Sequence, residues 1–228
     1  MARPSRSERF SPVVFDLDGT LVDSFDDLAG AVNAALAHFG HRELSPEVVK
    51  GFVGNGARLL VGRSLGASLG RDADADVEEV LERFETEYAA GCLHRTRLYS
   101  GVEGLLRELG RKGFRLAVLT NKPRLFAEKI LEGLGVIDLF YRVVGGDDFP
   151  VRKPDPCGLR ALAEEIGQSP SRGILVGDSE VDLQTARAGG MPFVGVAWGA
   201  RTATELHAAG ATQLVKAPGE LLAVLGGA

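Results

Sequence analysis

Two aspartates close to each other follow the first apolar run of the chain. Asp16 and Asp18 stand two positions apart, and Gly19 comes next. Residues i and i+2 of a strand point to the same side, so the two carboxylates are expected to be neighbours at a strand end. Such a pair stays ionised at low cost only where a cation neutralises it or one member holds a proton. This divides the chemistry between a nucleophile or metal ligand and a proton carrier. An ordinary Asp-Gly turn is the alternative.

A second acidic pair repeats this arrangement late in the chain. Asp178 follows the apolar run 174–177, and Asp182 comes four residues later, about one helical turn away. Carboxylate oxygens on a rigid strand, completed by water and a substrate phosphate, are the ligands that Mg²⁺ accepts. The spacing therefore predicts a Mg²⁺ site that involves Asp178.

Two further segments place polar side chains after apolar runs. Thr120 and Asn121 follow the run 115–119 and offer a hydroxyl and an amide, although alone such residues more often cap the next helix. Lys153 precedes Pro154 just before a predicted helix, and a surface lysine is its ordinary alternative. Gly19 has no side chain, which lets an anion approach the turning backbone.

The elements that position these residues are read from the apolar pattern. Continuous apolar runs predict buried parallel strands, and amphipathic segments between them predict helices, so we expect an α/β fold with a Rossmann-like parallel sheet. The predicted strands are 13–17, 115–120, 142–146, 173–177 and 193–197, and the predicted core helices are 102–112, 124–134, 156–166 and 181–188. Parallel strands lie about 4.8 Å apart, so groups that follow their carboxyl ends can converge on one anion.

The pattern changes to helix after helix between the first strand and Arg115. Predicted helices cover 25–39, a segment that opens at Pro46, 57–69 and 77–92. We therefore expect a helical cap domain, residues 23–96, inserted after the first strand of a core made of residues 1–22 and 97–228. The cap should lie over the carboxyl end of that strand.

Four motifs in this order resemble those of the haloacid dehalogenase-like hydrolases: Asp16-Leu17-Asp18-Gly19-Thr20, Thr120, Lys153-Pro154, and Gly177-Asp178-Ser179 with Asp182. The resemblance covers roughly residues 13 to 200. It implies a helical cap after the first strand and phosphoryl transfer through an aspartyl-phosphate. It makes Asp16 the nucleophile and Asp18 the general acid and base.

The resemblance also implies roles for the remaining polar residues. Mg²⁺ would be bound by Asp16, by the Asp18 backbone carbonyl and by Asp178, with support from Asp182. Phosphate would be held by Gly19, Thr120, Asn121 and Lys153. Dehalogenases proper lack the second acid of the first motif, so the presence of Asp18 favours a phosphatase.

Longer stretches around these motifs resemble bacterial phosphoglycolate phosphatases. They include 15–24, Val53-Gly54-Asn55-Gly56-Ala57-Arg58, Thr120-Asn121-Lys122-Pro123 and Lys153-Pro154-Asp155-Pro156. In this family the cap binds the part of the substrate beyond the phosphate. We therefore expect Asn55 and Arg58 to face the glycolate carboxylate. A tight turn between cap helices is the alternative interpretation of the glycines around Asn55.

Composition limits the partners and the compartment. The 228 residues are 45% hydrophobic and carry a net charge of −5, which disfavours nucleic acid as the main partner because such binding needs a concentrated basic surface. No segment approaches the roughly 20 apolar residues that span a bilayer, so we expect no membrane partner. Cys92 and Cys157 match no metal or redox spacing and are expected to be reduced thiols in a cytoplasmic protein.

These observations predict an enzyme that needs Mg²⁺ and hydrolyses a small phosphorylated metabolite, with 2-phosphoglycolate favoured. Other small substrates stay open: a sugar phosphate, a nucleotide or pyrophosphate. A sugar phosphomutase and a non-catalytic binding module on the same fold rank lower. The chain is expected to be a monomer or a homodimer.

Overall fold

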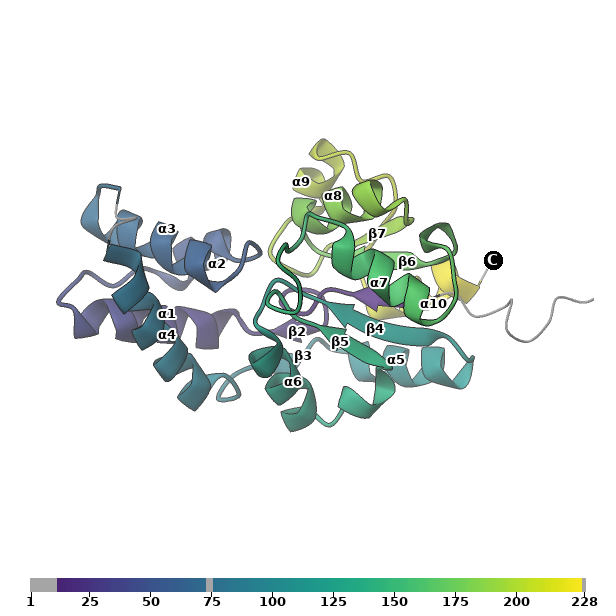
Figure 1. Cartoon of the computed structure of the whole chain (residues 1–228), viewed down its shortest axis with the longest axis horizontal. Helices are drawn as coiled ribbons and strands as arrows, with labels where there is room; N and C mark the ends of the chain where they lie inside the picture. The colour runs from purple at the N-terminus through teal and green to yellow at the C-terminus, as the bar shows by residue number, and fades with distance from the viewer. Residues whose placement is uncertain (1–11, 73–75, 227–228) are drawn as a thin grey trace, which may run out of the picture.

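The computed structural model describes residues 12–72 and 76–226, which form two lobes (Figure 1). The larger lobe is built on a six-stranded sheet in which all strands are parallel, in the order β5-β4-β1-β6-β7-β8. Its strands are β1 (Pro12–Phe15), β4 (Arg115–Leu119), β5 (Arg142–Val144), β6 (Ile174–Gly177), β7 (Phe193–Val196) and β8 (Leu214–Val215). The predicted parallel sheet is confirmed, although each predicted strand is one or two residues too long.

Strand β1 lies in the middle of the sheet and is buried on both faces. Val14 aligns with Ala117 of β4 and with Leu175 of β6. Side chains alternate across the strand, so Val13 and Phe15 pack in one apolar cluster while Val14 packs in another. This explains why the first run of the sequence is continuously apolar.

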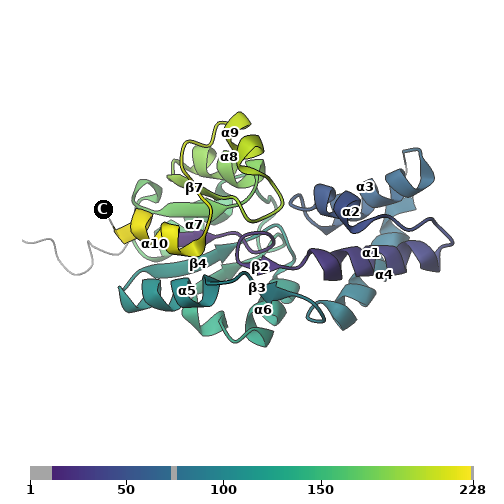
Figure 2. The same ribbon diagram turned by 180° about the vertical axis from the view of Figure 1, so that it is seen from behind.

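Helices cover both faces of the sheet (Figures 1 and 2). The core helices are α5 (Val102–Arg111), α6 (Arg124–Gly133), α7 (Cys157–Glu165), α8 (Glu180–Gly189), α9 (Ala203–Ala208) and α10 (Pro218–Gly226). Apolar residues of α5, α6 and α10 share a cluster with Val13 and Phe15, whereas α7 and α8 pack on the face of Val14. Two 3₁₀ turns, η3 (Ile137–Leu139) and η4 (Pro170–Arg172), complete the core.

The smaller lobe consists of four helices inserted between β1 and β4. They are α1 (Phe25–His38), α2 (Pro46–Phe52), α3 (Ala57–Leu69) and α4 (Val77–Gly91). Helix α1 packs against α2, α3 and α4, and buried apolar residues from all four helices fill the space between them. The predicted fold class, a parallel sheet with a helical cap after its first strand, is confirmed. The domain boundaries at residues 23 and 96 stay a prediction.

A two-stranded antiparallel ribbon joins the lobes. Strand β2 (Val22–Asp23) leads into the cap and pairs with β3 (Arg97–Leu98), which leads out of it. The apolar pattern did not predict this ribbon, because two-residue strands are too short to show a period of two. The elements β8, α9 and α10 near the end of the chain were not predicted either.

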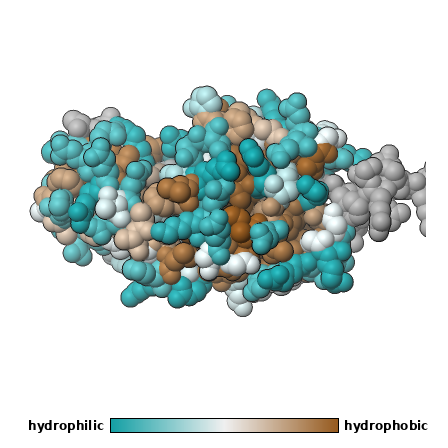
Figure 3. Space-filling view, turned by 60° about the horizontal axis from the view of Figure 1, so that its bottom comes forward, coloured by the Kyte–Doolittle hydropathy of each residue, from teal (hydrophilic) through white to brown (hydrophobic). Residues whose placement is uncertain are grey.

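On the face of the molecule drawn in Figure 3, hydrophobic residues (brown) lie among hydrophilic ones on both lobes. The brown areas are larger on the core than on the cap. Within the described ranges, no helix has the length and apolar character needed to cross a membrane.

Candidate active site

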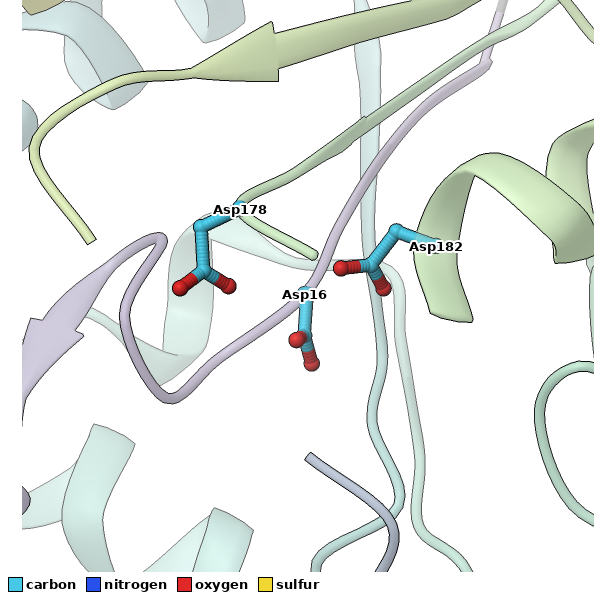
Figure 4. Close-up of side chains that lie close together, drawn as sticks. All are labelled: Asp16, Asp178 and Asp182. Carbon is cyan, nitrogen blue, oxygen red and sulfur yellow. The ribbon is translucent and has the colours of Figure 1, made fainter. Parts of the chain in front are cut away.

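Three aspartates from separate segments meet beyond the carboxyl ends of β1 and β6. Asp16 follows β1, Asp178 follows β6, and Asp182 lies in the first turn of α8. One carboxylate oxygen from each lies within 4.8 Å of the others, and Figure 4 shows the three side chains directed toward a common space. Because β1 and β6 are neighbours in a parallel sheet, residues that follow them are brought together, as the apolar pattern predicted.

Asp182 is fully buried, and both of its carboxylate oxygens have partners. Its Oδ1 accepts a hydrogen bond from Lys153 Nζ at 2.6 Å. Its Oδ2 accepts from the backbone N–H of Ser179 at 3.1 Å and from the Ser179 hydroxyl at 2.6 Å. The Ser179 hydroxyl in turn accepts from the Asp182 N–H, so the two residues form a capping box at the start of α8. These bonds hold Asp182 in position behind Lys153.

Lys153 links two of the acids. Its ammonium lies 2.9 Å from Asp16 Oδ1 and 2.6 Å from Asp182 Oδ1, and its side chain is only 2% exposed. Burial acts to lower the pKa of this ammonium, but the two carboxylates outweigh burial and hold the pKa above its ordinary value. Lys153 is therefore charged at neutral pH and neutralises part of the acidic cluster.

One positive charge does not balance this cluster. Burial raises the pKa of Asp16 to about 6, against the lowering effect of Lys153. Burial, with the charges of Asp182 and Asp16, raises the pKa of Asp178 to about 8. Both shifts show that negative charge is unfavourable here without a further cation.

The donor set fits a divalent cation. Asp16 Oδ1 accepts from the Leu17 N–H and from Lys153, whereas Asp16 Oδ2 accepts no hydrogen bond from any residue that the structure describes. Carboxylate oxygens are hard ligands of the kind that Mg²⁺ prefers. Asp16 and Asp178 can offer oxygens to the ion, while Asp182 is committed to its own hydrogen bonds.

Two glycines leave room for the Asp178 carboxylate. A Cβ atom on Gly19 would lie 2.2 Å from Asp178 Oδ2, and one on Gly199 would lie 2.3 Å from the same oxygen. Gly19 also has a φ of +84°, which side chains disfavour. The backbone N–H of Ala200 donates to Asp178 Oδ2 at 2.6 Å. Asp178 is thus held by a backbone that approaches closely from two loops.

Asp18 lies beside the cluster with different partners. Lys122 Nζ donates to its two oxygens at 2.9 and 2.8 Å, and the Ser24 hydroxyl donates to Oδ1 at 2.5 Å. The charge of Asp18 raises the pKa of Lys122, although burial acts in the opposite direction and is the larger single effect. Lys122 was not among the predicted site residues. Its signals in the sequence were its place directly after Thr120 and Asn121 and its presence in the resembling stretch Thr120-Asn121-Lys122-Pro123.

Thr120 and Asn121 both reach the site. The Thr120 hydroxyl is buried and accepts from the Lys122 N–H at 3.2 Å. The Asn121 amide nitrogen donates at 3.0 Å to two carbonyls, those of Gly54 in the cap and Lys153 in the core. Its oxygen Oδ1 is buried without a hydrogen-bond partner in the described part of the chain. Asn121 therefore ties a cap loop to the loop that carries Lys153.

A cavity of about 50 Å³ lies between the cap and these residues. The core side of its wall is polar and includes Asp16, Asp18, Thr120, Asn121, Lys122 and Asp178. The cap side is mainly apolar and includes Leu28, Val53, Leu60, Phe84 and Tyr88. The charged groups of the wall thus come from the core, and the cap covers them.

The two polar cap residues expected to face a substrate lie outside the wall of this cavity. Asn55 Oδ1 accepts a hydrogen bond from Arg63 at 2.9 Å, and Arg58 Nε pairs with Glu78 at 2.7 Å. Their glycine neighbours Gly54 and Gly56 do line the cavity. The structure therefore does not bring Asn55 and Arg58 to the acidic cluster, and their roles stay a prediction.

Comparisons with known proteins agree on one family. A model of the haloacid dehalogenase-like hydrolase family matches residues 13–196. A phosphoglycolate phosphatase from Rhodospirillum rubrum is 45% identical over 191 residues, which are 82% of this chain and 79% of the relative. A phosphoglycolate phosphatase from Vibrio parahaemolyticus is 37% identical over 218 residues, 93% of this chain and 95% of the relative.

Solved structures agree with the sequence relatives. The crystal structure of a predicted phosphoglycolate phosphatase from Haemophilus somnus has a TM-score of 0.89 and 30% identity, and the match covers 95% of this chain and 98% of that one. A predicted phosphatase from Clostridium acetobutylicum has a TM-score of 0.84 and 27% identity, with 96% and 99% covered.

Proposed function

Because the chain belongs to the haloacid dehalogenase-like hydrolases, we propose that it hydrolyses small phosphomonoesters with Mg²⁺ and prefers 2-phosphoglycolate. The prediction of a phosphoric monoester hydrolase is confirmed by the named activity of relatives at 37–45% identity. The observation that supports the chemistry is that Asp16, Asp18 and Asp178 line one cavity, while Lys153 lies behind them and binds Asp16.

Asp16 is the nucleophile of the proposed reaction. Its oxygen Oδ2 has no hydrogen-bond partner in the described ranges, so it can attack phosphorus while Lys153 holds Oδ1. Attack forms an acyl phosphate on Asp16 and releases the alcohol, and water then hydrolyses that bond. Lys153 restrains the repulsion between the carboxylate and the incoming phosphate.

Asp18 carries the proton in both steps. It protonates the leaving oxygen in the first step and takes a proton from the attacking water in the second. Ser24 and Lys122 fix the orientation of its carboxylate. Lys122 and the general acid therefore act as one unit beside the scissile bond.

Mg²⁺ would be held by Asp16, the Asp18 carbonyl and Asp178, with Asp182 in a supporting role. The bound ion supplies positive charge that stabilises the transferring phosphoryl group. Gly19, Thr120 and Asn121, together with Lys153, form the proposed phosphate-binding set. Residues 23–96 are the proposed cap domain, which covers the site.

Phosphate release across a substrate panel tests this function. The panel contains 2-phosphoglycolate, a sugar phosphate, a nucleotide, pyrophosphate and an aryl phosphate, each with Mg²⁺ and with a chelator. We expect the highest kcat/KM for 2-phosphoglycolate, and a loss of roughly 10⁴-fold or more in Asp16→Asn. Asp138→Asn, an exposed aspartate in η3, is the matched control and should change nothing.

The outcomes separate the parts of the proposal. Absence of phosphate release from every substrate would contradict the enzyme and support a binding module. A flat profile across the panel would remove the assignment of 2-phosphoglycolate and leave the phosphatase chemistry standing.

A further inference from the structure

A single basic side chain lines the cavity between cap and core, counted over the described residues. That side chain is Lys122, which comes from the loop after β4. The other charged groups in the wall are three aspartates, and the cap contributes mainly apolar side chains. Any negative charge on the leaving group must therefore meet Lys122, or be buried there without a partner at considerable cost.

We propose that Lys122 determines specificity by binding the carboxylate of the substrate's leaving group. This inference rests on the proposed function. It assigns recognition of the carboxylate to a residue of the core, whereas the sequence led us to expect it from residues of the cap. The substrates it selects are phosphate esters of short hydroxy acids, in which one carbon separates the ester oxygen from the carboxylate.

The position of Lys122 relative to Asp18 supports this assignment. Asp18 must contact the ester oxygen to donate its proton, and Lys122 Nζ lies 2.8 Å from Asp18 Oδ2. In a glycolate ester, the carboxylate begins one carbon from that same oxygen. The Lys122 ammonium, which is hydrogen-bonded to Asp18, is therefore within reach of the substrate carboxylate while the phosphorus atom faces Asp16.

The surroundings of Lys122 hold its ammonium at the cavity. Its Nζ lies 4.7 Å from the centre of the Tyr88 ring, a cation–π contact from helix α4 of the cap. Tyr88 is itself packed between Phe84 and Phe126, with ring centres 5.5 and 5.3 Å away. An ammonium has three N–H donors: two bind the oxygens of Asp18, and the third lies beside Tyr88, where a ligand in the cavity can compete for it.

Arg58 and Asn55, the cap residues expected to face the substrate, are already engaged, whereas the Tyr88 hydroxyl in the cavity wall is uncharged and has no hydrogen-bond partner among the described residues. Arg58 pairs with Glu78, and Asn55 accepts from Arg63, and neither lines the cavity. Binding by Lys122 needs no rearrangement of these pairs. The apolar cap wall then limits the size of the leaving group, and the core lysine recognises its charge.

Two substrates that differ in the carboxylate test the inference: 2-phosphoglycolate and ethyl phosphate. We expect Lys122→Met to lower the ratio of their kcat/KM values about 100-fold or more, because the carboxylate loses its only cation. Lys122→Arg should keep part of the preference. The glutamine of Lys122→Gln can still donate a hydrogen bond to Asp18 but carries no charge. This variant replaces Lys122→Met in the test if the methionine variant does not fold. Lys112→Met, on the surface, is the matched control.

Binding provides a second readout that does not depend on turnover. In the Asp16→Asn background, calorimetry with 2-phosphoglycolate should show weaker binding when Lys122 is replaced, whereas inorganic phosphate should bind equally well. Loss of selectivity in both readouts supports the inference.

Three results would overturn the inference. An equal fall for both substrates in Lys122→Met and Lys122→Gln would make Lys122 a positioning residue for Asp18 only. Loss of the preference in Arg58→Ala but not in the Lys122 variants would return recognition to the cap. A wild-type protein without preference for 2-phosphoglycolate would overturn the inference together with the substrate assignment, whereas the first two results leave the proposed function intact.

Discussion

The ion pairs of the core differ from those of the cap in their access to water. In the core, the side chains of Lys153, Asp16 and Asp182 are 2%, 9% and 0% exposed. In the cap, those of Arg58 and Glu78 are 43% and 66% exposed. Exposed pairs contribute little to stability, whereas removal of one partner from a buried pair leaves an uncompensated charge. The buried charges of the core therefore hold one another in place, whereas the Arg58–Glu78 pair of the cap is in contact with water.

The polar groups of the two lobes differ in the same way. The core supplies carboxylates, an amide, two hydroxyls and the Lys122 ammonium to the cavity, and each follows a strand end or begins a helix. The cap supplies mainly apolar side chains to the same cavity. The charged and hydrogen-bonding groups of the cavity thus come from the core, while the apolar part of its wall comes largely from the cap.

The largest effect is expected from Lys153→Met, which removes the buried cation. Asp16 and Asp182 then lie together without their common partner, so we expect destabilisation of about 3–5 kcal/mol. Activity should fall roughly 10²–10³-fold or more through loss of a charge that stabilises the phosphoryl group. Thermal unfolding and kcat with an aryl phosphate measure the two effects.

The matched control for this variant is Lys112→Met. Lys112 is exposed and lies 3.8 Å from Glu108, so its loss should change stability by less than about 0.5 kcal/mol. Equal effects of the two variants would refute the contrast between core and surface pairs.

An intermediate effect is expected from pH when divalent ions are absent. The pKa values of Asp16 and Asp178 are raised to about 6 and about 8, so the folded state keeps protons that the unfolded state releases. Stability should fall as pH rises from about 4 toward 8, by up to about 1.4 kcal/mol per pH unit for each proton kept. Midpoints of thermal unfolding measured in a chelator across this range test the direction.

If the cluster holds Mg²⁺ as proposed, added Mg²⁺ should reverse this loss, with a larger rise of the midpoint at pH 8 than at pH 5, because the ion would bind the deprotonated form. Asp178→Asn removes the group with the higher pKa and should flatten the pH profile. A midpoint that rises with pH in the chelator would contradict the acidic cluster described here.

The smallest effect is expected from Arg58→Ala in the cap. Its pair with Glu78 is exposed, so stability should change by less than about 0.5 kcal/mol. With Lys122 as the specificity residue, kcat/KM for 2-phosphoglycolate should stay within about threefold of the wild type. A fall of more than tenfold would favour the cap interpretation of Arg58 instead.

Much of the core was predictable because its elements are regular. The runs around Val14, Val118 and Val176 are buried on both faces, so their composition alone indicates parallel strands. Parallel neighbours then bring Asp16 and Asp178 together without further information. The catalytic roles of these residues stay predictions.

The rest depended on tertiary contacts. Lys122 lies beside a threonine and an asparagine that could equally cap a helix, and only the fold shows that it meets Asp18, which is 104 residues away. The sequence around Asn55 and Arg58 suggested a role for both, but the direction of a side chain in the loop before α3 or in its first turn depends on local partners such as Arg63 and Glu78.

The ribbon of β2 and β3 has a consequence for how the segment between these two strands can change during evolution. Val22 pairs with Leu98, so the chain leaves the core and returns to it at adjacent positions. The entropic cost of bringing two such positions together grows only slowly with the length of the segment between them, even when that segment is a whole helical lobe. The segment between these strands can therefore be shortened, lengthened or exchanged for another during evolution while every strand of the large sheet keeps its neighbours.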